Sequence, residues 1–223
     1  MKKEFTKRLS TSIFLIIIFL SPFFLNKYFW LMFVSLLSLV SYIEFENLFL
    51  KIKEIKKNFL FKIRLIIIVY LFFLILISFN IYDHYLLFVI TICILSDTGG
   101  YVIGKTFGGI KLTKISPNKT ISGAIGSLIF SLIPFIYLFV TENYDFFLFN
   151  FYNEKNYIFN LFTISIFLSI TCQIGDLLVS FLKRKANVKD TGKILPGHGG
   201  LLDRIDGIIF VIPISYIIFE IFL

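Results

Sequence analysis

The chain has 223 residues, of which 57% are hydrophobic and 19% aromatic, and its formal net charge is +8. Soluble domains use roughly 45–50% apolar residues, so this composition argues against an ordinary soluble fold. The apolar residues form long unbroken runs and lack the spacing of a helix with one wet face. The basic residues lie in the gaps between these runs, which membrane topology explains without a nucleic-acid partner. We therefore expect a membrane protein that binds no nucleic acid.

The apolar runs predict an all-α, polytopic membrane helix bundle, because a hydrocarbon core of about 30 Å needs about 20 apolar residues as a helix. Seven segments qualify: 11–26, 28–50, 65–80, 85–104, 120–141, 157–182 and 205–223. The first follows four basic residues, as in a signal peptide, but Leu25, Asn26 and Lys27 offer no small-residue cleavage site. We expect it to be retained as a span. No linker or repeat divides residues 1–223, so a single domain is expected.

Lysine and arginine are distributed unequally between the two sides of this bundle. With the N-terminus inside, the inner side holds four before the first span, six in 51–64, four in 105–119 and six in 183–204. The outer side holds only Lys27 and Lys155. Because cytoplasmic loops carry the excess of basic residues, this count predicts an N-in, C-out topology.

The inner gap before the last span and its flanks contain the densest polar cluster. Residues 176–206 include four carboxylates, six cations and one histidine. Oxygen ligands beside Lys and Arg suit a magnesium-bound polyphosphate, so this region predicts a nucleotide site. A basic collar at the end of a span is the alternative for Lys183, Arg184 and Lys185, and structural ion pairs are the alternative for the aspartates.

His198 stands between Gly197 and Gly199, where the backbone can approach a ligand closely. Phosphate contact and proton transfer are both open to it, as is a solvated histidine without a role. Zinc is not indicated, because no second His or Cys lies nearby at ligand spacing.

A second inner region runs from Ser96 to Gly123. The stretch from Gly99 to Thr106 satisfies the pattern of a Walker A loop, but that motif joins a buried strand to a helix, and here an apolar span precedes it. We reject that interpretation. Asp97, Lys105 and Lys119 remain candidate phosphate-site residues. The spacing of Gly100 and Gly104 favours helix–helix packing in lipid.

The segment from Ser180 to Asp206 resembles the signature of the phosphatidate cytidylyltransferase family. The matching positions are Ser180, Lys183, Arg184, Lys189, Asp190, His198, Gly199, Gly200, Asp203, Arg204 and Asp206. Gly175-Asp176 and Ser116-Pro117 with Lys119-Thr120 also look like family features, so the catalytic part covers about 96–207. Ser122 departs from the acid or amide that the family often has there. The chain is also short for the family, and we expect an outer span to be missing.

The resemblance implies that phosphatidate attacks the α-phosphorus of CTP, giving CDP-diacylglycerol and pyrophosphate. It implies Mg²⁺ held by Asp176 and Asp203, to which a monovalent cation could be added. The remaining implied catalytic residues are Lys183, Arg184, Lys189, His198, Arg204 and Asp206. The implied substrate-binding residues are Asp97, Lys105, Ser116, Lys119, Thr120, Ser180, Asp190, Gly199 and Gly200.

Because phosphatidate stays in the bilayer and CTP comes from the cytosol, we expect a bacterial inner-membrane enzyme with a cytoplasmic active site. A homodimer is compatible with this prediction. A transporter would instead place its charges near the midplane, within two related halves. A CTP-dependent lipid kinase or another CDP-alcohol enzyme is the second alternative.

Overall fold

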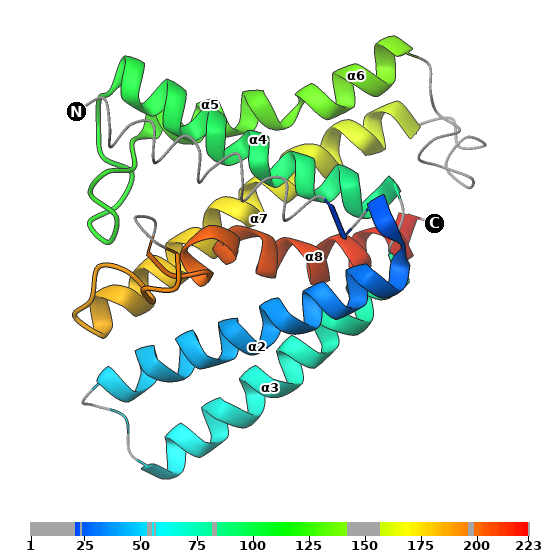
Figure 1. Ribbon diagram of the computed structural model, residues 1–223. Coiled ribbons are helices and arrows are strands. Elements are labelled where there is room, and N and C mark those ends of the chain that lie inside the picture. The colour runs from blue at the N-terminus through cyan, green and yellow to red at the C-terminus, as the bar shows by residue number, and fades with distance from the viewer. Residues whose placement is uncertain are drawn as a thin grey trace, which may run out of the picture. The chain divides into compact units, whose positions relative to one another are not determined.

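The computed structural model describes residues 21–22, 24–52, 55, 57–81, 84–141, 157–195 and 199–222. Within these ranges the protein is all-helical, and its only β-type pairings are two isolated bridges. Of the predicted first span, 11–26, residues 11–20 and 23 lie outside the described residues. The helices are α2 (Lys27–Lys51), α3 (Lys57–Asn80), α4 (His84–Phe107), α5 (Ile121–Ser131), α6 (Ile133–Thr141), α7 (Tyr157–Lys185) and α8 (Leu202–Phe222) (Figure 1).

Among the described residues, five helical stretches are long and apolar enough to cross a membrane. They are Lys27–Lys51, Asn58–Asn80, Tyr85–Phe107, Ile121–Thr141 and Ile158–Lys185. Each covers one of the predicted spans, with ends that differ by up to seven residues. The last predicted span, 205–223, is helical as α8, whose start carries Asp203, Arg204 and Asp206.

The chain divides into two compact units, and the first consists of residues 1–80 with 185–204. In this unit α2 and α3 lie side by side (Figure 1), and Glu46 Oε1 meets Arg64 Nη2 at 2.5 Å between them. Asn26 caps α2 by accepting hydrogen bonds from the backbone N–H groups of Tyr28 and Phe29.

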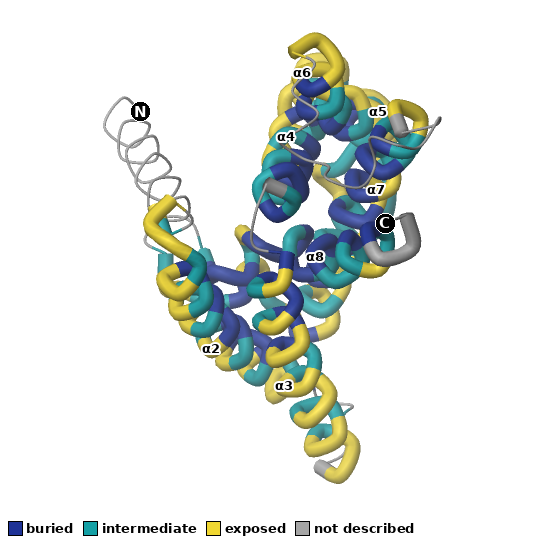
Figure 2. The backbone as a smooth tube through the Cα atoms, turned by 90° about the vertical axis from the view of Figure 1, so that its right-hand side faces the viewer, coloured by how far each residue is buried: buried dark blue, intermediate teal, exposed yellow. Residues whose placement is uncertain are grey.

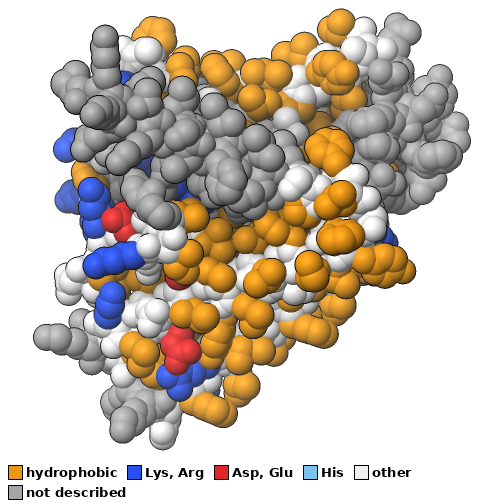
Figure 3. All heavy atoms as spheres, in the orientation of Figure 1, with side chains coloured by type: hydrophobic (Ala, Val, Ile, Leu, Met, Phe, Trp, Pro, Cys, Tyr) orange, Lys and Arg blue, Asp and Glu red, His pale blue; other side chains and the backbone are white. Residues whose placement is uncertain are grey.

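The outward surface of this helix pair is hydrophobic (Figure 3). Ile66 and Val69 of α3 are 68% and 60% exposed, whereas Leu71 and Leu74 are buried. The alternation of buried and exposed turns along α2 and α3 can be followed in Figure 2. Because so large an apolar surface is unfavourable in contact with water, this pattern indicates side chains that face lipid.

The second unit consists of residues 81–184 with 205–223 and contains α4 to α7 and most of α8. Its core includes Phe88, Val89 and Ile92 of α4 and Leu168 of α7, all 2% exposed or less. A buried hydrogen bond of 2.9 Å joins the hydroxyls of Ser96 on α4 and Ser169 on α7. The rings of Tyr85 and Phe219 lie 5.0 Å apart between centroids, tilted by 50°, and join α4 to α8.

Small residues allow α4 and α5 to approach closely. A Cβ on Gly100 would lie 2.5 Å from Ser127 Oγ, and one on Gly104 would lie 3.3 Å from Gly123 Cα. The packing role predicted for Gly100 and Gly104 is therefore confirmed, and their partners lie on α5. Such backbone proximity is what small residues provide between helices in lipid.

The predicted span 120–141 is not one continuous helix. It breaks into α5 and α6 at Leu132, whose N–H bonds to the carbonyls of Ile129 and Phe130. Pro134 causes this break, because proline has no N–H to donate to the carbonyl of Phe130 one turn earlier. The two pieces together still form one apolar stretch of 21 residues.

Candidate functional site

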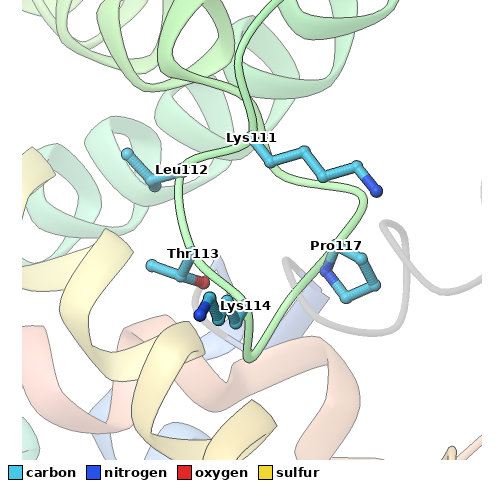
Figure 4. Close-up of a pocket in the computed structure, with 5 residues that line it drawn as sticks. All are labelled: Lys111, Leu112, Thr113, Lys114 and Pro117. Carbon is cyan, nitrogen blue, oxygen red and sulfur yellow. The ribbon is translucent and has the colours of Figure 1, made fainter.

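The loop between α4 and α5 positions several of the predicted residues. Gly108 and Gly109 end α4 with φ values of +58° and +102°, which a residue with a side chain rarely adopts. The loop then closes on itself, because the N–H of Leu112 donates to the carbonyl of Lys119 at 2.8 Å. Figure 4 shows this closed loop, with Lys111 and Pro117 on one side and Lys114 near its tip.

Lys119 stands at the end of this loop, directly before α5. Thr120 caps the helix by accepting a hydrogen bond of 3.1 Å from the N–H of Gly123. Ser122 Oγ donates to the carbonyl of Gly108 at 2.5 Å. In this chain, Ser122 therefore ties the loop to the end of α4 where the family often has an acid or amide.

An ion pair joins this loop to α7: the Lys119 ammonium contacts Asp176 Oδ2. Ser180, one turn further along α7, approaches Asp176 Oδ1 at 3.3 Å. Arg184 Nε donates to the carbonyl of Ile115 at 3.3 Å. Segment 96–123 therefore contacts residues 176–184 of α7.

A cavity of about 330 Å³ lies beside this ion pair. Its walls come from α4, the loop, the first turns of α5 and the middle of α7. The polar and small residues that line it include Asp97, Gly100, Ser116, Asn118, Lys119, Thr120, Ser127, Gln173 and Asp176. The cavity therefore combines carboxylates, an ammonium, amides, hydroxyls and the positive end of a helix, which together suit an anionic ligand with a cation.

Two further carboxylates accompany Asp176 in this unit. Asp97 opens onto the cavity and lies 3.7 Å from the sulfur of Cys172. Asp206 is 7% exposed and accepts a hydrogen bond of 3.0 Å from the N–H of Gly207. Asp97, Asp176 and Asp206 interact electrostatically with one another, and positive charge from Lys119 and Lys183 offsets their repulsion.

Gly175 explains how α7 and α8 come close enough for this interaction. A Cβ at Gly175 would lie 2.9 Å from the carbonyl oxygen of Asp206. The Gly175-Asp176 pair thus provides close helix contact at the first position and a carboxylate at the second. A larger residue at 175 would push Asp176 and Asp206 apart.

The first unit holds a second cluster, around Asp203. Its Oδ2 atom accepts hydrogen bonds from the N–H of Thr191 at 2.8 Å and from that of Gly200 at 3.0 Å. Gly199 has φ of +87°, and its position beside Asp190 leaves little room for a side chain. The two glycines and Asp203 of the signature therefore help residues 191–195 and 199–203 to pack together as one compact turn.

The other predicted residues are less enclosed or lie outside the described ranges. Lys105 contacts the hydroxyl of Tyr101 at 3.2 Å and is not among the cavity residues. Lys189, Asp190 and Arg204 are exposed in the first unit, and Lys183 is half-buried in the second. His198 lies outside the described residues, as do Pro196 and Gly197.

Carboxylates are the described side chains that could contribute oxygen ligands to a divalent metal. In the described part of the chain, no three His, Cys, Asp or Glu side chains are placed to hold a metal ion together. Asp176 pairs with the Lys119 ammonium. Carboxylate oxygens such as those of Asp176 are the ligands that Mg²⁺ prefers. The predicted assignment of the metal to Asp176 and Asp203 stays a prediction.

Three residues at or near the candidate site were not predicted from the sequence. Asn118 and Gln173 line the cavity, and no pattern in the sequence distinguishes them from ordinary polar residues. Glu44 is different, because it is an acidic residue inside a predicted span, where a charge is costly and marks a site. It lies on α2 and bonds to the turn that contains Asp203.

The fold and cavity define an all-helical protein with apolar helices of membrane-spanning length and a charged hollow suited to a phosphate-bearing ligand. The sequence profile of the Cytidylyltransferase family matches residues 53–222, and the chain belongs to this family.

Its relatives include proteins named phosphatidate cytidylyltransferase. The one from Staphylococcus haemolyticus is 46% identical over 137 residues, which are 60% of this chain and 48% of the relative. The one from Rickettsia bellii is 48% identical over 128 residues, 55% of this chain and 52% of the relative. The chain thus spans about half the length of the curated relatives it matches.

Proposed function

We propose that this protein transfers CMP from CTP to phosphatidate, releasing pyrophosphate and forming CDP-diacylglycerol. The observation that carries the proposal is the contact of Lys119 with Asp176 beside a cavity of about 330 Å³. This contact joins two segments that are far apart in the sequence and that both contain positions matched by the family resemblance. The names of the bacterial relatives supply the lipid acceptor.

In this proposal the cavity of the second unit receives the phosphates of CTP. Lys119 and the first N–H groups of α5 would face the negative oxygens, with Ser116 and Asn118 as hydrogen-bonding partners. A phosphate monoester such as phosphatidate is already ionised near neutral pH. No strong general base is therefore required, and positioning and charge stabilisation can supply most of the catalysis.

The remaining signature residues would serve the lipid headgroup and the leaving pyrophosphate. The cations proposed for these oxygens are Lys183, Arg184, Lys189 and Arg204, and His198 is proposed to contact a phosphate. Asp190 and Ser180 would orient these groups.

We also propose that the reaction requires Mg²⁺, with Asp176 as its principal ligand. Asp203 is the second predicted ligand, and Asp97 and Asp206 are placed near Asp176. Bound there, the ion would neutralise charge on the triphosphate. The protein's own residues would orient the nucleotide and hold the carboxylates of α7 and α8 close together.

The proposed setting is the inner membrane of a bacterium, with seven spans, an N-in orientation and the cavity facing the cytoplasm. The basic residues support it, because 20 of 22 fall on the predicted inner side. Only that boundary meets both a soluble nucleotide and a membrane lipid. A homodimer remains a prediction.

The experiment that tests the function offers the purified protein CTP, dCTP or ATP with several lipid acceptors, and identifies products by mass spectrometry. We expect a cytidine liponucleotide from CTP and phosphatidate, with its formation abolished by EDTA and restored by Mg²⁺. The Asp176→Asn variant serves as the background. Absence of a liponucleotide with every pairing would refute the proposal.

A further inference from the structure

Glu44 occupies an unusual position for an acidic side chain. It lies in the second half of α2, a helix of membrane-spanning length, and only 2% of the residue is exposed. Burying a carboxylate is costly unless its oxygens receive hydrogen bonds. Glu46, two residues further along, is by contrast partly exposed and pairs with Arg64.

Both oxygens of Glu44 receive hydrogen bonds from one distant segment of the chain. Oε2 accepts from the Thr191 hydroxyl at 2.7 Å and from the N–H of Leu202 at 2.8 Å, and Oε1 accepts from the N–H of Leu201 at 3.0 Å. Leu201 and Leu202 stand at the start of α8, where backbone N–H groups have no partner within the helix. Glu44 therefore caps α8 from a neighbouring helix.

The same segment is bonded from its other side by Asp203. Its Oδ2 atom accepts from the N–H groups of Thr191 and Gly200, and the Thr191 hydroxyl lies 3.1 Å from it. A hydroxyl has one proton to donate. Because that hydroxyl is 2.7 Å from Glu44, we assign its proton to Glu44 and leave the backbone N–H to Asp203.

Two glycines make this close approach possible. A Cβ at Gly200 would lie 2.5 Å from Glu44 Oε2, and one at Gly192 would lie 2.9 Å from Glu44 Cδ. Gly200 is a signature position, so the turn is shaped around the Glu44 carboxylate as well as around Asp203. Glu44 itself lies outside the residues that the family profile matches.

We propose that Glu44 is a positioning residue for the transfer reaction. It fixes Thr191, Leu201 and Leu202. Through them it sets the orientation of Asp203 and Arg204 in the first turn of α8. This inference rests on the proposed function, since Asp203 and Arg204 have predicted roles in it. A residue that only anchored α8 would affect stability without a selective effect on turnover.

The test compares Glu44→Gln with Glu46→Gln, a matched control on the same helix. The amide introduced by Glu44→Gln keeps the shape of the carboxylate but turns one acceptor into a donor. In either orientation this donor faces a backbone N–H, of Leu201 or Leu202, that must itself donate. We expect kcat to fall about 10- to 100-fold, the range typical when a partner that orients a functional ligand is lost. KM for CTP should change less than about threefold, and Glu46→Gln should retain wild-type kcat.

A second readout does not depend on activity. Amide hydrogen exchange should become faster at residues 191–195 and 199–203 in Glu44→Gln, with α4 and α5 unchanged as an internal reference. If the wild-type protein transfers no cytidylyl group, the proposed function fails, yet faster exchange still establishes that Glu44 holds the turn.

Thr191→Val covers the case in which Glu44→Gln does not fold. It removes the hydroxyl and keeps the backbone N–H, so we expect a smaller fall in kcat with the same pattern of faster exchange. If both single variants fold, the double variant of Thr191→Val and Glu44→Gln should lose less kcat than the product of the two single losses, because the two side chains share one hydrogen bond. Wild-type kcat in Glu44→Gln, or exchange in the turn that matches Glu46→Gln, would overturn the proposal.

Discussion

At the scale of single residues, the ion pair between Lys119 and Asp176 contributes little to the stability of the fold. The two side chains are 25% and 29% exposed. A partly buried pair of this kind contributes little net stability, because the cost of desolvating the two charges offsets their attraction. Its placement beside the cavity therefore points to ligand binding, in which one cation and one carboxylate serve the same phosphate site.

We predict that Lys119→Ala and Asp176→Asn each lower kcat/KM for cytidylyl transfer by about 10²–10³-fold, the cost of removing one charge-stabilising group. Thermal inactivation in detergent should change by only a few degrees, because the pair contributes little stability. Initial rates of liponucleotide formation measure the effect.

Lys114→Ala is the matched control for this pair, since Lys114 is exposed in the same loop and is absent from the cavity lining. It should retain wild-type kcat/KM. Equal activity in Lys119→Ala and Lys114→Ala would contradict the role of Lys119.

The sequence predicted which residues carry charge for a phosphate site, but not which residues each of them contacts. The signature pointed to Asp176 and Lys119, which do meet. Lys105 had the right charge for a phosphate contact, but a helical turn places it over Tyr101. The partners of Glu44 lie about 150 positions away, a pairing that local patterns do not encode.

At the scale of elements, the contact between α4 and α5 positions the cavity. Gly126 packs against Ile103, and a Cβ there would lie 2.8 Å from the carbonyl of Gly99. Backbone cannot yield as a flexible side chain can. The glycine spacing on α4 predicted a packing face, but the register of α5 against it depends on tertiary structure.

We predict that Gly126→Val destabilises the protein by about 1–3 kcal/mol or more, because overpacking forces the two helices apart. Separation of α4 from α5 should also lower activity, since both helices line the cavity. The apparent melting temperature in detergent, followed by tryptophan fluorescence or retained activity, is the measurement.

Ile125→Phe provides the control for added volume, because Ile125 is 52% exposed on α5 beside Gly126. It should melt within a degree or two of wild type. A melting temperature for Gly126→Val as high as that of Ile125→Phe would show that the contact tolerates a larger residue.

At the scale of the whole molecule, the helix content followed from the apolar runs, and five of the predicted spans are helices of crossing length. The length of the apolar run predicts one helix over 120–141, whereas the structure breaks it at Leu132, next to Pro134. Helices also extend beyond the apolar runs, as in α3, since polar residues at a membrane boundary continue the hydrogen-bonded helix.

We predict that the loop carrying Lys114 faces the cytoplasm and that the end of α6 faces the other side. The native thiols Cys93 and Cys172 are buried, so they should give a low labelling background. Lys114→Cys should react with a membrane-impermeant maleimide in inverted vesicles, and Thr141→Cys in right-side-out vesicles. The reverse labelling pattern would contradict the N-in topology.

In the proposed reaction the nucleotide reacts at its α-phosphorus, which distinguishes cytidylyl transfer from the action of a CTP-dependent lipid kinase. Parallel reactions of the purified protein with phosphatidate and CTP labelled at either the α- or the γ-phosphate test it directly. We predict that the α-label enters the chloroform-soluble lipid while the γ-label leaves as pyrophosphate, and that both transfers stop in Asp176→Asn. Lipid carrying the γ-label, or no labelled lipid from either nucleotide, would contradict the account.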